Sequence, residues 1–155
     1  MKEELILLSK AFKNGERIPE RYTCDGLDIS PPLKIKGPDE GTKSFALILD
    51  DPDAPMGVFD HWLIWNIDPK IREIEENVPK QENVLRGAVQ GRNSARRIGY
   101  MGPCPPYGTH TYRFKLYTLD IKLDLNAGAT KKDLEKKMEG HIIQHTLLRG
   151  TYSRR

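Results

Sequence analysis

The sequence predicts a mainly β protein with one convincing helix and two long loops. Eleven prolines and thirteen glycines fall in clusters between apolar runs, and most of those runs are too short for long helices. Only one segment carries both a helix-start and a helix-stop signal. With 155 residues, 37% of them hydrophobic and 30% charged, residues 1–155 are expected to form a single domain around one core.

The expected strands follow one another along the chain. Ser44–Asp50 is apolar almost throughout, which is typical of a strand buried on both faces. Trp62 and Trp65 are three residues apart in the next run, so a strand places them on opposite faces. The full set of expected strands is Glu4–Phe12, Leu33–Lys36, Ser44–Asp50, His61–Ile67, Val84–Gln90, Thr109–Leu119 and Ile142–Ser153.

The helix is expected over Lys131–Glu139, ended by a glycine. Thr130 is a candidate N-cap, and Asp133 three residues later resembles the acid of a capping box. Leu134 and Met138 are four residues apart and therefore share the face that packs on the sheet.

Charge and hydropathy exclude several classes of protein. With 25 Lys and Arg against 22 Asp and Glu, the net charge of +3 does not demand a nucleic-acid partner. No apolar run approaches the roughly 20 residues of a membrane-spanning helix, so no integral membrane association is expected. The acidic N-terminus is unlike a secretory leader, which favours a cytoplasmic location.

Cys24 and Cys104 make one bridge or none, and the sequence leaves this open.

Acids and histidines stand where the two long loops meet strands. The segment Asp51-Pro52-Asp53-Ala54-Pro55 holds two carboxylates in a loop stiffened by two prolines. His61 opens the strand that follows, and His110 opens the strand after the loop 91–108. Each residue alone is more often structural, but neighbouring strands would bring them together. Imidazoles and glycine-rich backbone then favour an anion such as phosphate, sulfate or carboxylate, with Asp51 orienting a ring.

Motifs along almost the whole chain, from residue 21 to residue 152, resemble the phosphatidylethanolamine-binding protein family, in its bacterial and archaeal Raf kinase inhibitor-like branch. They are Phe45-Ala-Leu-Ile-Leu-Asp-Asp-Pro-Asp-Ala-Pro55, Asp60-His61-Trp62, Gly91-Arg-Asn-Ser94, Gly99-Tyr-Met-Gly-Pro-Cys-Pro-Pro106 and Gly108-Thr-His110. The resemblance implies a large central antiparallel sheet, a smaller second sheet and one or two short peripheral helices. It also implies a small site for phosphate-type groups and no cofactor or metal.

The resemblance also implies which residues line that site. The ligand-binding residues of the family fall on Asp51, His61, Gly102, Pro103, Pro105, His110 and Tyr112. Support of the loops falls to Asp53, Pro52, Pro55 and Cys104. No catalytic residue is expected.

Two departures from the family pattern affect the expected partners. Thr111 stands where many members have arginine after the second histidine, which removes a positive charge near the site. Eukaryotic members continue into a C-terminal helix that covers the site, whereas this chain ends at Arg155. We therefore expect a more open site and a homodimer formed through the C-terminal strand, since an unpaired strand edge invites pairing.

The function expected is that of a non-catalytic protein that binds a phospholipid headgroup or a phosphorylated metabolite or peptide. Family resemblance supplies one alternative, a serine protease inhibitor that acts through exposed loops, and it raises a protease or a kinase as protein partners. Three weaker alternatives come from the residues. They are a metal-dependent hydrolase using the aspartates and histidines, a nucleophile–base pair of Cys104 and His110, and nucleic-acid binding by Arg92, Arg96 and Arg97 beside Tyr100.

Overall fold

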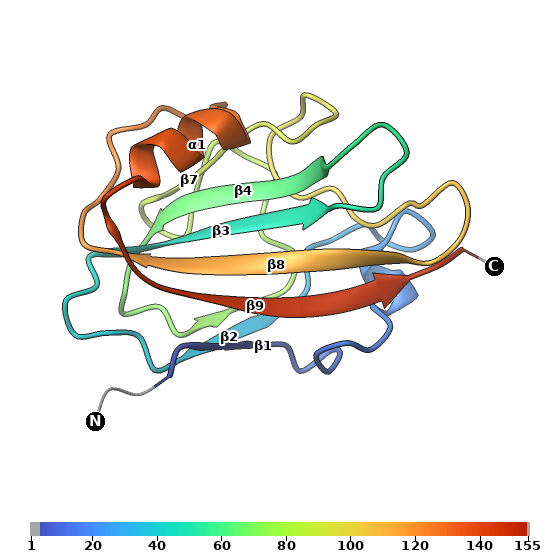
Figure 1. Ribbon diagram of the computed structural model, residues 1–155, viewed down its shortest axis with the longest axis horizontal. Coiled ribbons are helices and arrows are strands. Elements are labelled where there is room, and N and C mark those ends of the chain that lie inside the picture. The colour runs from blue at the N-terminus through green and yellow to red at the C-terminus, as the bar shows by residue number, and fades with distance from the viewer. Residues whose placement is uncertain (1–3, 155) are drawn as a thin grey trace.

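The computed structural model describes residues 4–154, and its strands form two sheets (Figure 1). The strands are β1 (Ile6–Leu8), β2 (Leu33–Lys36), β3 (Ser44–Asp51), β4 (Phe59–Ile67), β5 (Glu73–Ile74), β6 (Asn83–Val84), β7 (Ala88–Gln90), β8 (His110–Leu119) and β9 (Ile142–Tyr152). The helices are a short 3-10 helix, η1 (Glu20–Tyr22), and α1 (Lys131–Met138).

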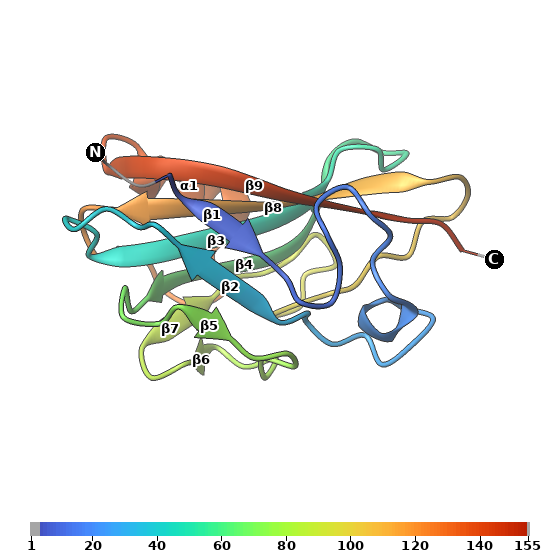
Figure 2. The same ribbon diagram turned by 90° about the horizontal axis from the view of Figure 1, so that it is seen from below.

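The two sheets match the predicted fold class. The large sheet has six strands in the order β6-β7-β4-β3-β8-β9, and the small sheet has the order β1-β2-β5. All the paired strands within these sheets run antiparallel. We call the face of the large sheet that meets the small sheet the inner face, and the face that carries α1 the outer face (Figures 1 and 2). The mainly β prediction is therefore confirmed.

Side chains of the central strands pack into a core on each face of the large sheet. Along β3, Phe45, Leu47 and Leu49 join the inner core, whereas Ala46 and Ile48 join the outer one. This alternation is why Ser44–Asp50 reads as an unbroken apolar run. On β4, Trp62 lies in the inner core and Trp65 in the outer core, as the sequence predicts.

Helix α1 forms with the predicted cap. The Thr130 side chain accepts a hydrogen bond from the Asp133 N–H, and the Asp133 carboxylate accepts one from the Thr130 N–H. Leu134 and Met138 are buried against the outer face. The helix ends one residue earlier than expected, and Gly140 follows with a φ of +80°.

Two strand predictions are corrected. The predicted strand Glu4–Phe12 is only Ile6–Leu8, the three residues that pair with residues 34–36 of β2. The predicted strand Val84–Gln90 is a tight hairpin of β6 and β7. Leu85 and Arg86 adopt φ values of 51° and 55° between them, and positive φ at both central residues is what such a turn requires.

The edge of β9 is partly covered. Backbone hydrogen bonds join Gly15 N–H to the Arg149 carbonyl and Ile18 N–H to the Thr151 carbonyl, both at 2.8 Å. The Thr151 N–H also donates to Glu16. The C-terminal strand is therefore not the free edge that the sequence predicts, and pairing with another chain would have to use the other end of β9.

A disulfide joins the two long loops. Cys24 and Cys104, 80 positions apart, are bonded to each other, which answers the question that the sequence leaves open. The Cys24 N–H also donates to the Pro103 carbonyl at 3.1 Å, so the loops are joined through backbone as well. Among residues 4–154, no helix is long and apolar enough to cross a membrane.

Candidate functional site

Three neighbouring strands of the large sheet bring the predicted residues together at one end of the strands. β3 lies between β4 and β8, and it ends at Asp51 where β8 begins at His110. The ring centroid of Tyr112 lies 5.3 Å from that of His61 and 6.4 Å from that of His110. Asp51, His61, His110 and Tyr112 thus form one group, which we call the histidine cluster.

A hydrogen bond fixes the ring of His110. Its Nδ1 lies 2.6 Å from the Asp51 carboxylate, and both side chains are almost fully buried. A carboxylate oxygen accepts, so Nδ1 carries the proton and Nε2 is the nitrogen left for a ligand. Asp51 therefore orients the imidazole, as the sequence predicts.

Asp53 braces the loop that carries Asp51. The Asp53 N–H donates to the Asp51 carboxylate, and the Asp53 carboxylate accepts from the Thr111 N–H, both at 2.8 Å. These bonds fasten the loop between β3 and β4 to the beginning of β8. The role assigned to Asp53 from the sequence, support rather than ligand contact, agrees with these bonds.

A β-bulge aims His61 at the cluster. Leu49 pairs with Trp62 but Asp50 pairs with Asp60, so His61 is an extra residue in β4. Strict alternation from Trp62 would place His61 on the outer face; the bulge instead sends it inward and Asp60 outward. The sequence places His61 at the start of a strand but carries no signal for this bulge.

Burial affects the pKa of His61, and one backbone carbonyl fixes its tautomer. Its side chain is 5% exposed, and burial lowers the pKa of the imidazole against the opposing effects of the Met101 carbonyl and the Asp51 charge. Nδ1 lies 2.6 Å from that carbonyl, which accepts, so Nδ1 holds the proton here too. Neutral His61 therefore presents Nε2 as an acceptor, and protonated His61 presents it as a donor.

The hydroxyl of Tyr112 is buried without a well-formed hydrogen bond. The side chain is fully buried, and its oxygen lies among the few buried side-chain atoms of residues 4–154 that have no partner. Burial and then the nearby Asp51 charge raise the pKa of Tyr112, so the phenol stays protonated and able to donate. A buried hydroxyl without a well-formed hydrogen bond, next to two histidines, is a candidate for contact with a ligand.

The wall of the cluster comes from the loop before β8. A Cβ on Gly102 would lie 2.4 Å from the Tyr22 carbonyl oxygen, so only glycine allows this approach. The Gly102 N–H donates to Asp28 at 2.6 Å, so Gly102 shapes the wall and does not offer a free donor. The Cys104 backbone lies next to the Tyr112 hydroxyl, which brings the disulfide up to the cluster. Pro103 and Pro105 are buried in the same loop.

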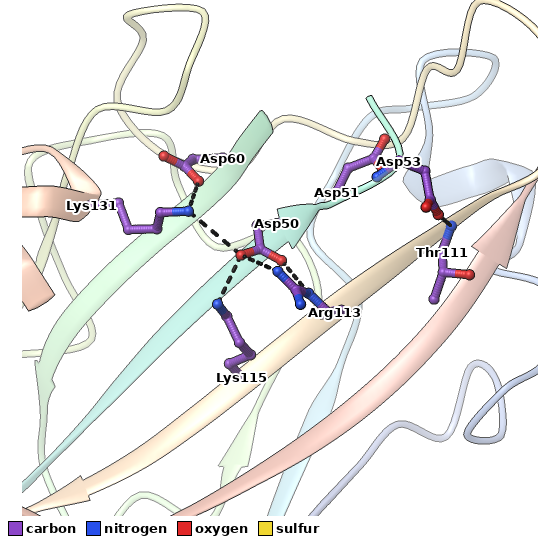
Figure 3. A network of polar contacts seen from close by, with 8 residues as sticks. All are labelled: Asp50, Asp51, Asp53, Asp60, Thr111, Arg113, Lys115 and Lys131. Carbon is purple, nitrogen blue, oxygen red and sulfur yellow. Dashed lines mark hydrogen bonds and ion pairs between the residues drawn. The ribbon is translucent and has the colours of Figure 1, made fainter. Parts of the chain in front are cut away.

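Behind the cluster, a charged network occupies the outer face. Asp50, fully buried, accepts hydrogen bonds from Arg113 at 2.7 and 3.1 Å, and its carboxylate lies 2.8 Å from the Lys115 ammonium. Burial alone would raise the pKa of Asp50, but these cations outweigh it and lower the pKa. Lys131 lies 3.6 Å from Asp50 and 2.7 Å from Asp60 (Figure 3). Sequence reasoning missed this network entirely.

Several alternatives from the sequence lose support. Cys104 is in a disulfide and is not a free thiol, so the nucleophile–base pair is wrong. Tyr100 is buried and donates to the Tyr22 carbonyl at 2.6 Å, so it is not available to stack on a base beside the arginines. Within residues 4–154, no three His, Cys, Asp or Glu side chains are grouped to hold a metal ion.

A surface cavity of about 560 Å³ lies elsewhere, over the small sheet. It is lined by residues such as Leu8, Leu33 and Ile74, and shares none with the histidine cluster. His61 and His110 are each 5% exposed, so the cluster is less open than the sequence predicts. The cluster offers a ligand two ring nitrogens and one buried phenol, which together suit a compact group with oxygen atoms.

Comparison with known proteins points to one family. The family model described as phosphatidylethanolamine-binding protein matches residues 8–153. A UPF0098 protein of Pyrococcus abyssi is 53% identical over 99% of this chain and 88% of its own length. A UPF0098 protein of Methanothermobacter thermautotrophicus is 51% identical over 96% of this chain and 98% of its own length.

Solved structures agree. The crystal structure of a phosphatidylethanolamine-binding protein homologue from Chlamydia trachomatis superimposes with a TM-score of 0.92 at 39% identity, covering 98% of this chain and 99% of the other. Escherichia coli YbcL, described as a member of the mammalian family, gives a TM-score of 0.91 at 30% identity, covering 99% and 100%.

Proposed function

Because the chain belongs to the phosphatidylethanolamine-binding protein family, we propose that it binds a small phosphate-type anion at the histidine cluster and does not turn it over. Family membership supports a binding role. The anion is the phosphate of a phospholipid headgroup or of a phosphorylated metabolite or peptide. In this proposal, Nε2 of His61 and Nε2 of His110 donate to the anion, and the Tyr112 hydroxyl makes a third bond.

One observation carries the proposal: the Tyr112 hydroxyl is buried beside the two histidines and makes no hydrogen bond of good geometry, although the Asp51 carboxylate and the Cys104 backbone lie near it. A phosphate oxygen would satisfy it. The Asp51 carboxylate, which holds Nδ1 of His110, would repel a bare dianion. A monoprotonated phosphate fits these groups best, because its own O–H can donate to Asp51 while its other oxygens accept from the two histidines.

Isothermal titration with inorganic phosphate tests the proposal. We expect binding by the native chain and its loss in His61→Ala and in His110→Ala, with circular dichroism unchanged. His145→Ala is the matched control, because His145 is exposed on β9 and lies outside the cluster. Retained affinity in both cluster variants would remove the assignment.

Native mass spectrometry of the purified chain distinguishes the sources of the phosphate. A retained lipid, metabolite or phosphopeptide has a characteristic mass, whereas free phosphate adds one small increment. The homodimer and the cytoplasmic location stay predictions, which light scattering and cell fractionation address.

A serine protease inhibitor is the second candidate. Met56 is fully exposed in the proline-containing loop between β3 and β4, which Asp53 fastens at its base. An apolar side chain held out on a braced loop is what a protease recognition pocket requires. Inhibition that survives in the double variant His61→Ala/His110→Ala but is lost in Met56→Asp would favour this function over anion binding.

A further inference from the structure

The β-bulge at His61 must be stabilised by contacts of the residues around it. If the extra residue were removed from the pairing of β3 with β4, each side chain at the N-terminal end of β4 would exchange faces. His61 would leave the histidine cluster, and Asp60 would replace it there. The contacts that Asp60 makes on the outer face therefore determine whether His61 points inward.

Asp60 is held on the outer face by backbone and by charge. Its N–H donates to the Ser94 hydroxyl at 2.7 Å, and its carbonyl accepts from the Ser94 N–H at 2.8 Å. Its carboxylate lies 2.7 Å from the Lys131 ammonium. Among residues 4–154, Lys131 is the one cation within ion-pair distance of Asp60. Both side chains are about one-fifth exposed, with values of 20% and 19%, so water screens this pair only in part.

Lys131 stands at an unfavourable place for a lysine. It is the first residue of α1, where the helix dipole favours an acid and opposes a cation. At this place, however, its ammonium forms ion pairs with both Asp60 of β4 and Asp50 of β3, the two residues that pair at the bulge (Figure 3). Asp50 does not depend on it, because Arg113 and Lys115 already satisfy that carboxylate.

We propose that Lys131 is a positioning residue for the histidine cluster: it holds Asp60 on the outer face and thereby keeps the β-bulge that turns His61 inward. Lys131 forms its ion pairs with Asp50 and Asp60, which lie outside the histidine cluster. Its effect passes through the pairing of β4 with β3, which can be bulged or regular at His61. A change from one pairing to the other would move His61 directly, without a series of intermediate residues. This inference rests on the proposed function where affinity is the readout, but its structural readout does not.

The test uses Lys131→Met, which keeps the side-chain length and helix propensity but removes the charge. Lys132→Met is the matched control, because Lys132 is the next residue of the same helix and is exposed. We expect Lys131→Met to weaken phosphate binding by about 2- to 30-fold, the range typical of residues that act without ligand contact, and Lys132→Met to leave it unchanged. Lys131→Arg should restore binding.

Nuclear magnetic resonance of the ligand-free chain gives the readout that a purely stabilising role would not move. In Lys131→Met the His61 Nδ1–H signal, held by the Met101 carbonyl, should shift or broaden at a temperature where the fold is intact. His141 and His145 should not respond. The charges of Asp51, Asp28 and Asp60 all act on His61, so the spectra of all the variants are recorded at one pH.

A double-mutant cycle keeps the proposal falsifiable should Lys131→Met fold poorly. Asp60→Asn removes the charge that Lys131 binds, so it should reproduce the loss, and combining the two should cost no more than either alone. Additive losses would overturn the proposal, as would an unshifted His61 signal in Lys131→Met. If the native chain binds no phosphate while the His61 signal shifts as expected, the proposed function fails and the positioning role stands.

Discussion

Replacing Tyr112 by phenylalanine should stabilise the protein while it weakens anion binding. A buried hydroxyl without a hydrogen bond costs about 1–3 kcal/mol, and the Tyr112 hydroxyl has no well-formed bond. The nearby Asp51 carboxylate gives back part of that cost, so we expect a gain at the low end, about 1 kcal/mol in the free energy of unfolding. For a chain of this length, such a gain raises the melting temperature by about 2–4 °C.

The same substitution should reduce phosphate affinity. A hydrogen bond to a charged group contributes about 1.5–3 kcal/mol, which corresponds to about 10- to 150-fold in the dissociation constant. A substitution that raises the free energy of unfolding but lowers phosphate affinity indicates that the Tyr112 hydroxyl serves binding and not stability.

Tyr100→Phe is the matched control for this chemical change. The Tyr100 hydroxyl is also buried, but it donates to the Tyr22 carbonyl at 2.6 Å. Its removal leaves that carbonyl unpaired, so stability should fall by about 1–3 kcal/mol and binding should hardly change. Guanidinium unfolding and phosphate titration measure both quantities. A loss of stability in Tyr112→Phe equal to that in Tyr100→Phe would refute the reasoning.

Three further predictions concern other parts of the molecule. Sulfate affinity should rise as pH falls, because a bound anion raises the pKa of His61, which burial lowers in the free protein. The gain should level off below that free-state pKa, and His61→Ala should flatten the profile. Replacing both Cys24 and Cys104 by serine should cost about 2–5 kcal/mol in guanidinium unfolding, since the bridge spans 80 positions; unchanged stability would mean that it does not constrain the chain. Gly150→Ala should cost about 1–3 kcal/mol in the same assay, because its Cβ would lie 2.5 Å from an Ile18 carbon atom; a stable variant would show that this contact yields easily.

Local signals in the sequence predicted the central strands and the helix. The unbroken apolar run of β3, the opposite faces of Trp62 and Trp65 and the Thr130–Asp133 cap depend on residues close together in the chain, and all are confirmed. The meeting of Asp51 with His110 followed from their places at loop–strand junctions, together with the family resemblance.

Features that depend on distant pairing had no local signal. The bulge at His61 is a property of how β4 pairs with β3, and neither strand reveals it alone. The cover over β9 comes from residues 15–18, more than 130 positions away in the chain, by backbone bonds that any sequence can make. Nothing in the sequence distinguishes Lys131 from its neighbour Lys132, because only the fold places Asp50 and Asp60 beside Lys131.

Nitrogen-15 NMR of the histidine rings during a phosphate titration tests the central claim most directly. We expect the Nε2 signals of His61 and His110 to move together toward the values of protonated donors, while those of His141 and His145 stay in place. Saturating phosphate that leaves both cluster signals unmoved, or moves all four histidines alike, would contradict the claim that these side chains form the anion site.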